Sequence, residues 1–206
     1  MQAVLDEAVE TQKVMKSIAD LDTGFIFIAG PTCSGKTTLA YRLKYYFEYR
    51  FETVTVIKQD DYLKDLRDMP RSQRGYFTDS MDAFYVEEMK RDFDLYIKNG
   101  KAEIPMYDLA SNSRFSAKQY IVKSQITIVE GLHTISLFHG MKNSVYIYLD
   151  TPINECLKRR IMRDRISYRI PEDRVKKHFQ DCIMPSYEEE ILPQRKLHGV
   201  IIYDFV

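Results

Sequence analysis

The sequence predicts an α/β domain in which helices cover both faces of a parallel sheet. Apolar runs of strand length recur along the chain, helical stretches lie between them, and a glycine-rich segment follows the first run. Most of these runs are continuously apolar rather than alternating, which is typical of parallel strands covered on both faces. A length of 206 residues suits one such domain together with a small lid.

The elements alternate along the chain in the order expected of that class. Strands are predicted over 24–29, 53–58, 126–130, 145–150 and 200–204. Helices are predicted over 37–49, about 83–98, 153–167 and about 171–184. This alternation predicts one five-stranded parallel sheet. The polar, weakly periodic segment 106–125 is predicted to be a long loop that carries function.

Residues 1–20 are predicted to form an amphipathic helix that precedes the domain, which we place at residues 21–206. Its apolar positions include Val4, Val9 and Val14. The helix is either a linker from a longer protein or an extra helix packed on the domain. Nothing in its sequence points to catalysis.

The composition excludes several classes of protein. Thirty basic residues balance thirty acidic ones, which gives no general attraction to nucleic acid or to an anionic membrane. The chain shows no apolar run of about 18 residues and no signal-peptide pattern, so we expect a soluble, cytoplasmic protein. Its cysteines, Cys33, Cys156 and Cys182, are odd in number and widely spaced, which argues against a disulfide framework or a zinc site. We expect a small-molecule partner, and the sequence is compatible with a homo-oligomer.

The glycine-rich segment after the first strand has a specific pattern. Residues 30–37 match G-x-x-x-x-G-K-[ST] at every fixed position, between an apolar strand and a helix. Backbone amides in such a loop bind phosphate, Lys36 can reach the β- and γ-phosphates, and Thr37 can ligate magnesium. The segment predicts a P-loop fold that uses ATP and Mg²⁺, and an ordinary glycine-rich turn is the weaker alternative. The predicted nucleotide-binding residues are Gly30, Pro31, Thr32, Cys33, Ser34, Gly35, Lys36, Thr37 and Thr38.

Carboxylates follow two other strands. The second strand ends before Asp60 and Asp61, and either could accept the proton of an attacking hydroxyl or hold magnesium. Both could instead cap the next helix. Glu130 closes the third strand, where a carboxylate suits a magnesium contact, and Gly131 lets the chain turn close to the phosphates.

Residues 158–165 form a strongly basic stretch on the predicted helix after the fourth strand. Arg163 shares a helix face with either Arg159 or Arg160 because these residues lie four and three positions apart. Arginines above ATP can stabilise the charge of a transferring phosphoryl group, so we favour a lid. The alternatives are a solvated, salt-bridged surface helix and a nucleic-acid patch, and the neutral charge balance makes the patch a poor fit.

Further motifs in this order and spacing resemble the uridine–cytidine kinase group of the uridine kinase and phosphoribulokinase family, from about residue 24 to residue 204. They are Gln59-Asp60, Asp82-Ala-Phe84, Ile104-Pro-Met-Tyr107-Asp108, Glu130-Gly131 and Arg159-Arg160-Ile-Met-Arg163-Asp164. The resemblance implies a P-loop kinase fold with a nucleoside-binding hairpin and a basic lid. It also implies ATP-dependent transfer of a phosphoryl group to the 5′-hydroxyl of uridine or cytidine.

The resemblance further implies roles for single residues. Asp60 falls at the catalytic base, and Thr37, Asp60 and Glu130 fall at the magnesium-proximal positions. Asp79 falls where a carboxylate holds the ribose hydroxyls, and Tyr107 and Asn112 fall on the nucleoside-binding hairpin. The implied catalytic residues are therefore Asp60, Lys36, Arg160 and Arg163, and the implied acceptor-binding residues are Asp79, Tyr107, Asn112 and Arg160.

Four departures from the family pattern concern the acceptor rather than the phosphates. Asn112 stands where the family has histidine, Leu63 replaces an aromatic residue, and Ser80-Met81 replaces a His-Pro step. The Gly-Arg step beyond the lid is missing, and Arg169 is a candidate to replace it. We therefore expect intact phosphate chemistry with altered recognition of the base.

Three hypotheses follow from these observations. The first is an ATP-dependent kinase of a nucleoside or a similar ribosyl compound. The second is a kinase of another small alcohol, such as a sugar phosphate, pantothenate or glycerate. The third is a regulatory ATP-binding module with a degenerate acceptor site. A GTPase is a weaker hypothesis because the chain has no N-K-x-D motif for reading guanine.

Overall fold

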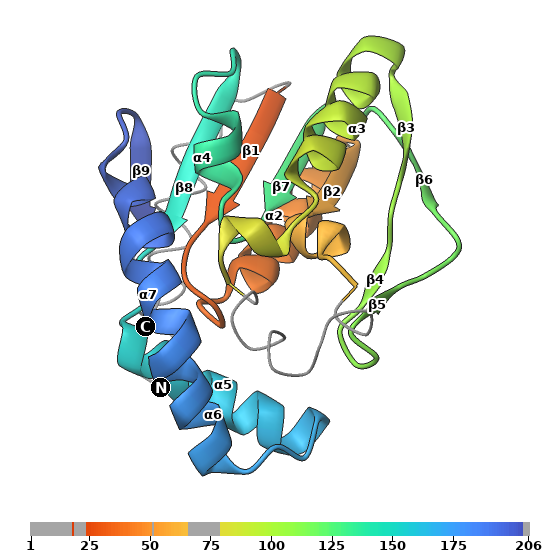
Figure 1. The fold of residues 1–206 in the computed structure, drawn as a ribbon. Coiled ribbons are helices and arrows are strands. Elements are labelled where there is room, and N and C mark those ends of the chain that lie inside the picture. The colour runs from red at the N-terminus through yellow and green to blue at the C-terminus, as the bar shows by residue number, and fades with distance from the viewer. Residues whose placement is uncertain (1–17, 19–23, 51, 66–78, 204–206) are drawn as a thin grey trace.

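The computed structural model describes residue 18 and residues 24–50, 52–65 and 79–203. At its centre is a five-stranded sheet in the order β2–β7–β1–β8–β9, in which every pair is parallel (Figure 1). The strands are β1 (Gly24–Ala29), β2 (Val54–Lys58), β7 (Ile126–Glu130), β8 (Ser144–Leu149) and β9 (Val200–Tyr203). The predicted sheet is confirmed, except that Asp204, the last residue predicted for the fifth strand, lies outside the described residues.

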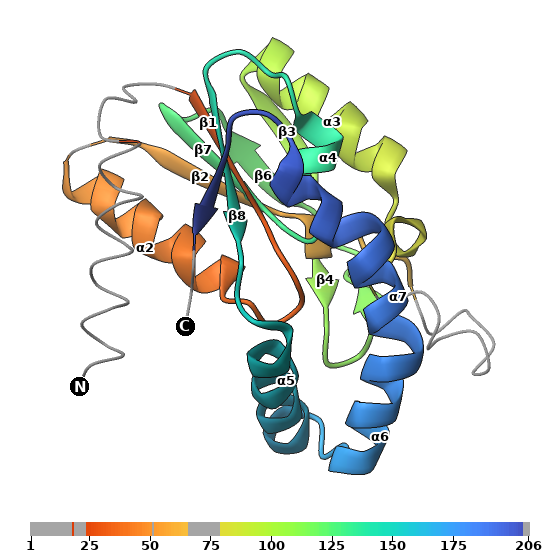
Figure 2. The same cartoon turned by 90° about the vertical axis from the view of Figure 1, so that its left-hand side faces the viewer.

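Helices cover the sheet on both faces. Helix α2 (Lys36–Tyr49) lies on one face, and α3 (Val86–Asn99) and α4 (Thr134–Phe138) lie on the other (Figure 2). Successive side chains of a strand point to opposite faces, so β1 contributes to both layers. Ile26 and Ile28 pack in the cluster with α2, while Phe27 packs in the cluster with α3 and α4. This double burial explains why the strands are continuously apolar in sequence.

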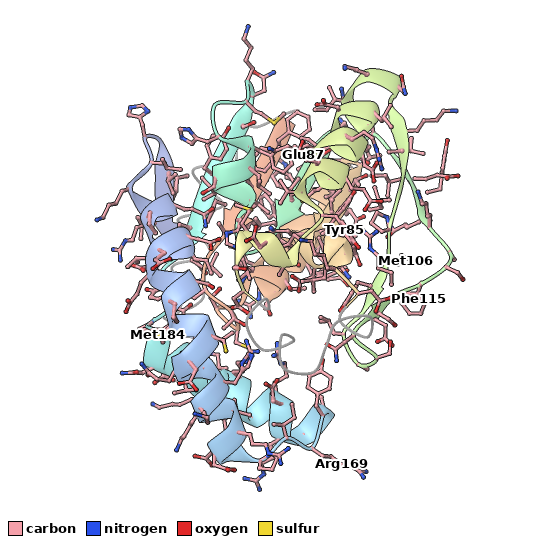
Figure 3. All side chains as sticks on the ribbon, viewed as in Figure 1. Tyr85, Glu87, Met106, Phe115, Arg169 and Met184 are labelled. Atoms are coloured by element: carbon pink, nitrogen blue, oxygen red, sulfur yellow. The ribbon has the colours of Figure 1, made fainter. Side chains whose placement is uncertain are left out.

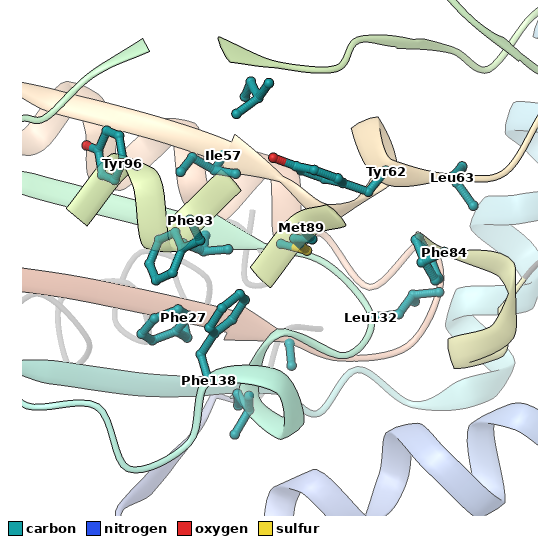
Figure 4. Packing of buried hydrophobic residues seen from close by; sticks show 14 of the residues in the cluster. Phe27, Ile57, Tyr62, Leu63, Phe84, Met89, Phe93, Tyr96, Leu132 and Phe138 are labelled. Atoms are coloured by element: carbon teal, nitrogen blue, oxygen red, sulfur yellow. The ribbon is translucent and has the colours of Figure 1, made fainter. Parts of the chain in front are cut away.

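An aromatic core fixes α3 and α4 to the central strand. The ring centroids of Phe27 and Phe138 lie 5.3 Å apart, and those of Phe93 and Phe138 lie 4.6 Å apart (Figure 4). Such ring pairs contribute roughly 0.5–1.5 kcal/mol each beyond the area they bury. The packing holds the carboxyl ends of β1 and β7 in a rigid frame, and the functional loops start from these ends.

Helix α5 (Ile153–Ser167) matches its predicted bounds and extends beyond the carboxyl ends of the strands (Figure 2). The helical segment that follows is longer than predicted. It continues past 184 through α6 (Glu172–His178), a π-helical turn over 179–183, α7 (Met184–Ser186), a second π-helical turn over 187–191 and a 3-10 turn over 192–196. We call residues 172–196 the C-terminal arm. Pro185 lacks a backbone donor, and the wider π turns on either side accommodate it without ending the helix.

The segment predicted as a loop over 106–125 is partly strand. Strand β6 (Gln119–Val122) pairs antiparallel with β3 (Lys101–Ile104), and β4 (Tyr107–Asp108) pairs antiparallel with β5 (Ser113–Arg114) to form a hairpin. The implied hairpin is therefore present. The β3–β6 ribbon was missed because its strands are short and β6 has only one buried residue, Ile121.

The predicted N-terminal helix lies outside the described residues, apart from Ile18. That residue is helical and buried in the same cluster as Leu43 and Phe47 of α2. Among the helices that the structure describes, none is long and apolar enough to span a membrane.

Candidate active site

A cavity of about 1020 Å³ opens at the carboxyl ends of the sheet strands. Its walls come from the loop after β1, the ends of β2 and β7, the β4–β5 hairpin and helix α5. The predicted site residues among its lining are Thr32, Cys33, Gly35, Lys36, Thr37, Thr38, Asp60, Asp79, Tyr107, Asn112, Glu130, Arg160 and Arg163. The fold therefore brings together side chains that are more than a hundred positions apart in sequence.

A few predicted residues do not line this cavity. Gly30, Pro31 and Ser34 belong to the loop after β1 without being part of the cavity wall. Arg169 is exposed on the turn after α5 and points away from the body of the molecule (Figure 3). Arg169 is therefore not among the residues that form the cavity wall, although its neighbours Tyr168 and Ile170 are.

The loop between β1 and α2 has the geometry of an anion site. Gly35 caps the helix with a φ of 104°, a conformation that glycine adopts without strain. Cys33 also has a positive φ, of 55°. The Lys36 side chain is 8% exposed, and its Nζ donates a hydrogen bond to the Pro31 carbonyl at 2.8 Å. The lysine therefore folds back across the loop, next to the helix N-terminus that favours bound phosphate.

Oxygen ligands suitable for magnesium meet at the ends of β1, β2 and β7. The Thr37 hydroxyl donates to Glu130 Oε1 at 3.0 Å. Lys58 pairs in register with Glu130, so Asp60 emerges beside the same strand end. Burial raises the pKa of Glu130 to about 7, and the charge of Asp60 adds to that rise. Burial also raises the pKa of Asp60, with the charge of Asp79 as a further cause and Lys36 opposing it.

This donor set fits a magnesium ion. Buried carboxylates that repel each other are stabilised by a cation, and magnesium prefers hard oxygen ligands. In the part of the chain that the structure describes, no three His, Cys, Asp or Glu residues form a metal cluster. Magnesium does not require one, because it keeps several waters and binds through one or two carboxylates and the phosphates of a substrate.

Asp60 and Asp61 have different surroundings. Asp60 lines the cavity. Asp61 Oδ1 accepts a hydrogen bond from the backbone N–H of Tyr107 at 3.1 Å, and Asp61 is not part of the cavity wall. Asp61 therefore fixes the β4–β5 hairpin, and Asp60 is the one of the two carboxylates that faces the cavity. The Tyr107 hydroxyl is tied to the same region because it donates to the Lys64 carbonyl at 3.3 Å.

Arg160 and Arg163 of helix α5 both contact Asp164 of the same helix. Arg160 is 9% exposed, and its Nη1 donates to the Thr32 hydroxyl at 3.0 Å and lies 3.7 Å from Asp79 Oδ1. Asp164 contacts Arg160 Nε at 3.4 Å and accepts a bond from Arg163 Nε at 2.8 Å. Arg160 thus joins the loop after β1 to Asp79 and is buried, while Lys158, Arg163 and Arg165 of the same helix are exposed.

Sequence reasoning missed the part that Asp164 plays, because Asp164 entered as the last residue of the motif that begins at Arg159 and was given no role in the site. Asp164 is 5% exposed, and its carboxylate contacts both Arg160 and Arg163. The signal was present, since Arg160 and Asp164 are four positions apart and such pairs face each other on a helix.

Sequence reasoning also missed the role of the Gln59 side chain. Its Oε1 accepts a hydrogen bond from the backbone N–H of His133 at 2.8 Å. A Cβ at Gly131 would lie 2.3 Å from Gln59 Cβ, so only glycine allows this approach. The glycine was expected to let the chain approach the phosphates, whereas the structure shows that it makes room for Gln59. The contact ties the loop before Asp60 to the loop after Glu130.

Comparison with known proteins places this geometry in context. Residues 25–205 match the Phosphoribulokinase / Uridine kinase family. A uridine kinase from Staphylococcus aureus is 30% identical over 189 residues, which cover 87% of each chain. Among solved structures, a putative fructose transport system kinase from Silicibacter aligns with a TM-score of 0.69 at 17% identity, over 91% of this chain and 92% of the other. A D-glycerate 3-kinase from Cryptococcus neoformans aligns with a TM-score of 0.63 at 12% identity, over 100% and 96%.

Proposed function

Because the chain belongs to the Phosphoribulokinase / Uridine kinase family and is thereby an ATP-dependent kinase of an alcohol, we propose that it phosphorylates the 5′-hydroxyl of a uridine- or cytidine-like nucleoside. The observation that carries this proposal is the state of Asp79. Its side chain is 4% exposed, it lines the cavity, and its Oδ2 has no hydrogen-bond partner among the described residues. A buried carboxylate oxygen without a donor is costly, and a ribose hydroxyl would satisfy it.

The chain's own groups divide the chemistry among them. The loop amides and Lys36 would hold the phosphates of ATP, and Thr37, Asp60 and Glu130 would hold magnesium. The metal, when bound, neutralises charge on the phosphates. Asp60 lines the cavity and takes the proton of the acceptor hydroxyl. Little covalent chemistry is left to the protein, so positioning and charge stabilisation dominate.

The cavity wall includes several apolar residues and could accommodate a ring. Its lining adds Leu63, Leu109, Ala110 and Leu132 to Tyr107 and Asn112. Leu63 keeps apolar surface but cannot stack as an aromatic residue does. Asn112 offers a donor and an acceptor without a ring. These features favour a ribosyl acceptor whose base is recognised less strictly than in standard members of the family.

We therefore expect uridine and cytidine to be turned over, but with lower kcat/KM than in a standard uridine kinase. The test is kcat/KM for uridine, cytidine, purine nucleosides, glycerate, pantothenate and sugar phosphates at saturating Mg-ATP. The proposal is supported if nucleosides exceed the other alcohols. It is wrong if a non-nucleoside alcohol is clearly preferred, or if ATP binds tightly and no acceptor increases ADP release. The last outcome would favour a regulatory module.

We also expect Arg160→Ala and Arg163→Ala to lower kcat more than they weaken ATP binding. An arginine that contacts the transferring phosphoryl group acts mainly in the transition state. Arg160→Ala should in addition raise the KM of the acceptor, because Arg160 lies 3.7 Å from Asp79. Arg165→Ala, an exposed residue of the same helix, is the matched control. Steady-state kinetics with each substrate varied will decide. A higher KM for ATP at unchanged kcat would instead make both arginines ground-state clamps.

A further inference from the structure

The mechanism above leaves a buried imidazole unused. His133 lies three residues after Glu130, at 0% exposure, and is not part of the cavity wall. Its surroundings come from segments that carry three of the carboxylates lining the cavity. These segments are the turn after β2 with Asp60, the end of β7 with Glu130, and the start of the 79–84 segment with Asp79.

The imidazole contacts the acceptor-side segment directly. His133 Nε2 lies 2.9 Å from the backbone carbonyl of Asp79. A carbonyl only accepts hydrogen bonds, so Nε2 carries the proton. Burial lowers the pKa of His133 to about 4, which keeps the ring neutral. Nδ1 is then unprotonated, and it has no hydrogen-bond partner among the described residues.

The backbone around His133 is held by the turn after β2 and by the C-terminal arm, and its ring is packed by the 79–84 segment. Its N–H donates to Gln59 Oε1 at 2.8 Å, and Gln59 directly precedes Asp60. The Phe84 ring packs edge-on against the imidazole, with centroids 5.8 Å apart at 72°. Gln194 of the C-terminal arm donates from Nε2 to the Leu132 carbonyl at 2.7 Å. The imidazole therefore projects from a backbone that has little freedom to shift.

The C-terminal arm also holds the far side of the acceptor segment. Glu190 Oε2 accepts a hydrogen bond from the backbone N–H of Met81 at 2.6 Å, and it lies 3.9 Å from His133 Nδ1. The backbone of residues 79–81 is thus held at its Asp79 carbonyl by His133 and at its Met81 amide by Glu190. These contacts determine where the Asp79 side chain enters the cavity.

We propose that His133 is a positioning residue: by donating from Nε2 to the Asp79 carbonyl, and with Glu190 as its counterpart on Met81, it sets the place of Asp79 relative to Asp60 and Glu130. The effect on turnover rests on the proposed function, in which Asp79 binds the acceptor. The hydrogen-bond arrangement around His133 does not depend on the proposed function. The experiment therefore has one arm that needs no acceptor and another that does.

In the first arm, ¹⁵N NMR of the wild-type protein should show His133 neutral with its proton on Nε2. Hydrogen exchange followed by mass spectrometry should show faster exchange of segment 79–84 in His133→Phe than in wild type. His133→Gln should restore slow exchange, because its side-chain amide can donate to the same carbonyl. An unprotonated Nε2, or unchanged exchange in a folded His133→Phe protein, overturns the proposal.

In the second arm, uridine is the acceptor. His133→Phe should raise the KM for uridine about tenfold, as the loss of one buried hydrogen bond predicts, with little change in the KM for ATP. His133→Gln should recover most of the loss. If His133→Phe fails to fold, Glu190→Ala is used in its place, because Glu190 is partly exposed. This variant should also raise the KM for uridine. Glu189→Ala, at an exposed neighbour, is the control.

The outcomes of the two arms are separable. Equal losses for ATP and uridine, or no rescue by glutamine, would mean a merely structural histidine and overturn the proposal. If wild type does not phosphorylate uridine at all, the proposed acceptor is wrong, and the first arm alone then decides whether His133 positions Asp79.

Discussion

Replacing Lys36 by alanine is expected to reduce acceptor-dependent ADP release to background while the protein stays folded. Lys36 is the cation that the phosphate loop itself supplies, and it is 8% exposed beside the helix N-terminus. Backbone amides alone cannot follow the charge that moves onto the β–γ bridge, whereas a mobile ammonium can. The measurement is ADP release, together with the circular dichroism spectrum and the melting temperature of the variant.

Lys44→Ala is the matched control for this experiment. Lys44 lies on the same helix, is partly exposed and pairs with Glu48, so its loss should leave turnover near wild type. Activity of Lys36→Ala near that of Lys44→Ala would contradict the assignment of the phosphate loop. A loss of activity accompanied by a lost dichroism signal would show unfolding, and Lys36→Met, which keeps the apolar stem, would then be used.

Replacing Asp60 by asparagine is expected to lower kcat by about 10²–10⁴-fold, which is the usual contribution of a general base. The amide has nearly the same shape but cannot take a proton, and it is a weaker ligand for magnesium. Asp61→Asn should cost far less, because the asparagine Oδ1 can still accept the hydrogen bond from the Tyr107 amide. The two variants carry the same chemical change at adjacent positions, so each is a control for the other.

Single-turnover kinetics with both variants would measure this difference at the chemical step. Should Asp61→Asn prove the more damaging change, the base has been placed one residue off, and the hairpin contact of Asp61 would need another explanation. Similar small losses in both variants would mean that positioning, without a protein base, accounts for the rate.

The phosphate loop and the strand ends could be predicted because the information is local. The segment from Gly30 to Thr37 carries its own pattern, and each strand is a short apolar run. The meeting of Thr37 and Glu130 across 93 positions also followed, since carboxyl ends of parallel strands share one edge of a sheet. In the structure the two side chains are joined by a 3.0 Å hydrogen bond.

Other features depend on tertiary contacts that no local pattern shows. Apart from the family resemblance, the residues left Asp60 and Asp61 as equal candidates, and the position of the β4–β5 hairpin gives them different surroundings. The helical arm passes Pro185 because two π turns accommodate it. The contact of His133 with Asp79 joins residues 54 positions apart through a backbone carbonyl, for which side-chain identity gives no signal.

The central claim is that the chain moves a phosphoryl group from ATP to a nucleoside hydroxyl, and product analysis tests it most directly. A reaction containing Mg-ATP and the nucleoside with the highest kcat/KM would be followed by ³¹P NMR. We predict one new phosphomonoester at the 5′ position for each ADP formed, and its absence with Lys36→Ala. ADP formed with inorganic phosphate alone, or a phosphomonoester only on a non-nucleoside alcohol, would contradict the account.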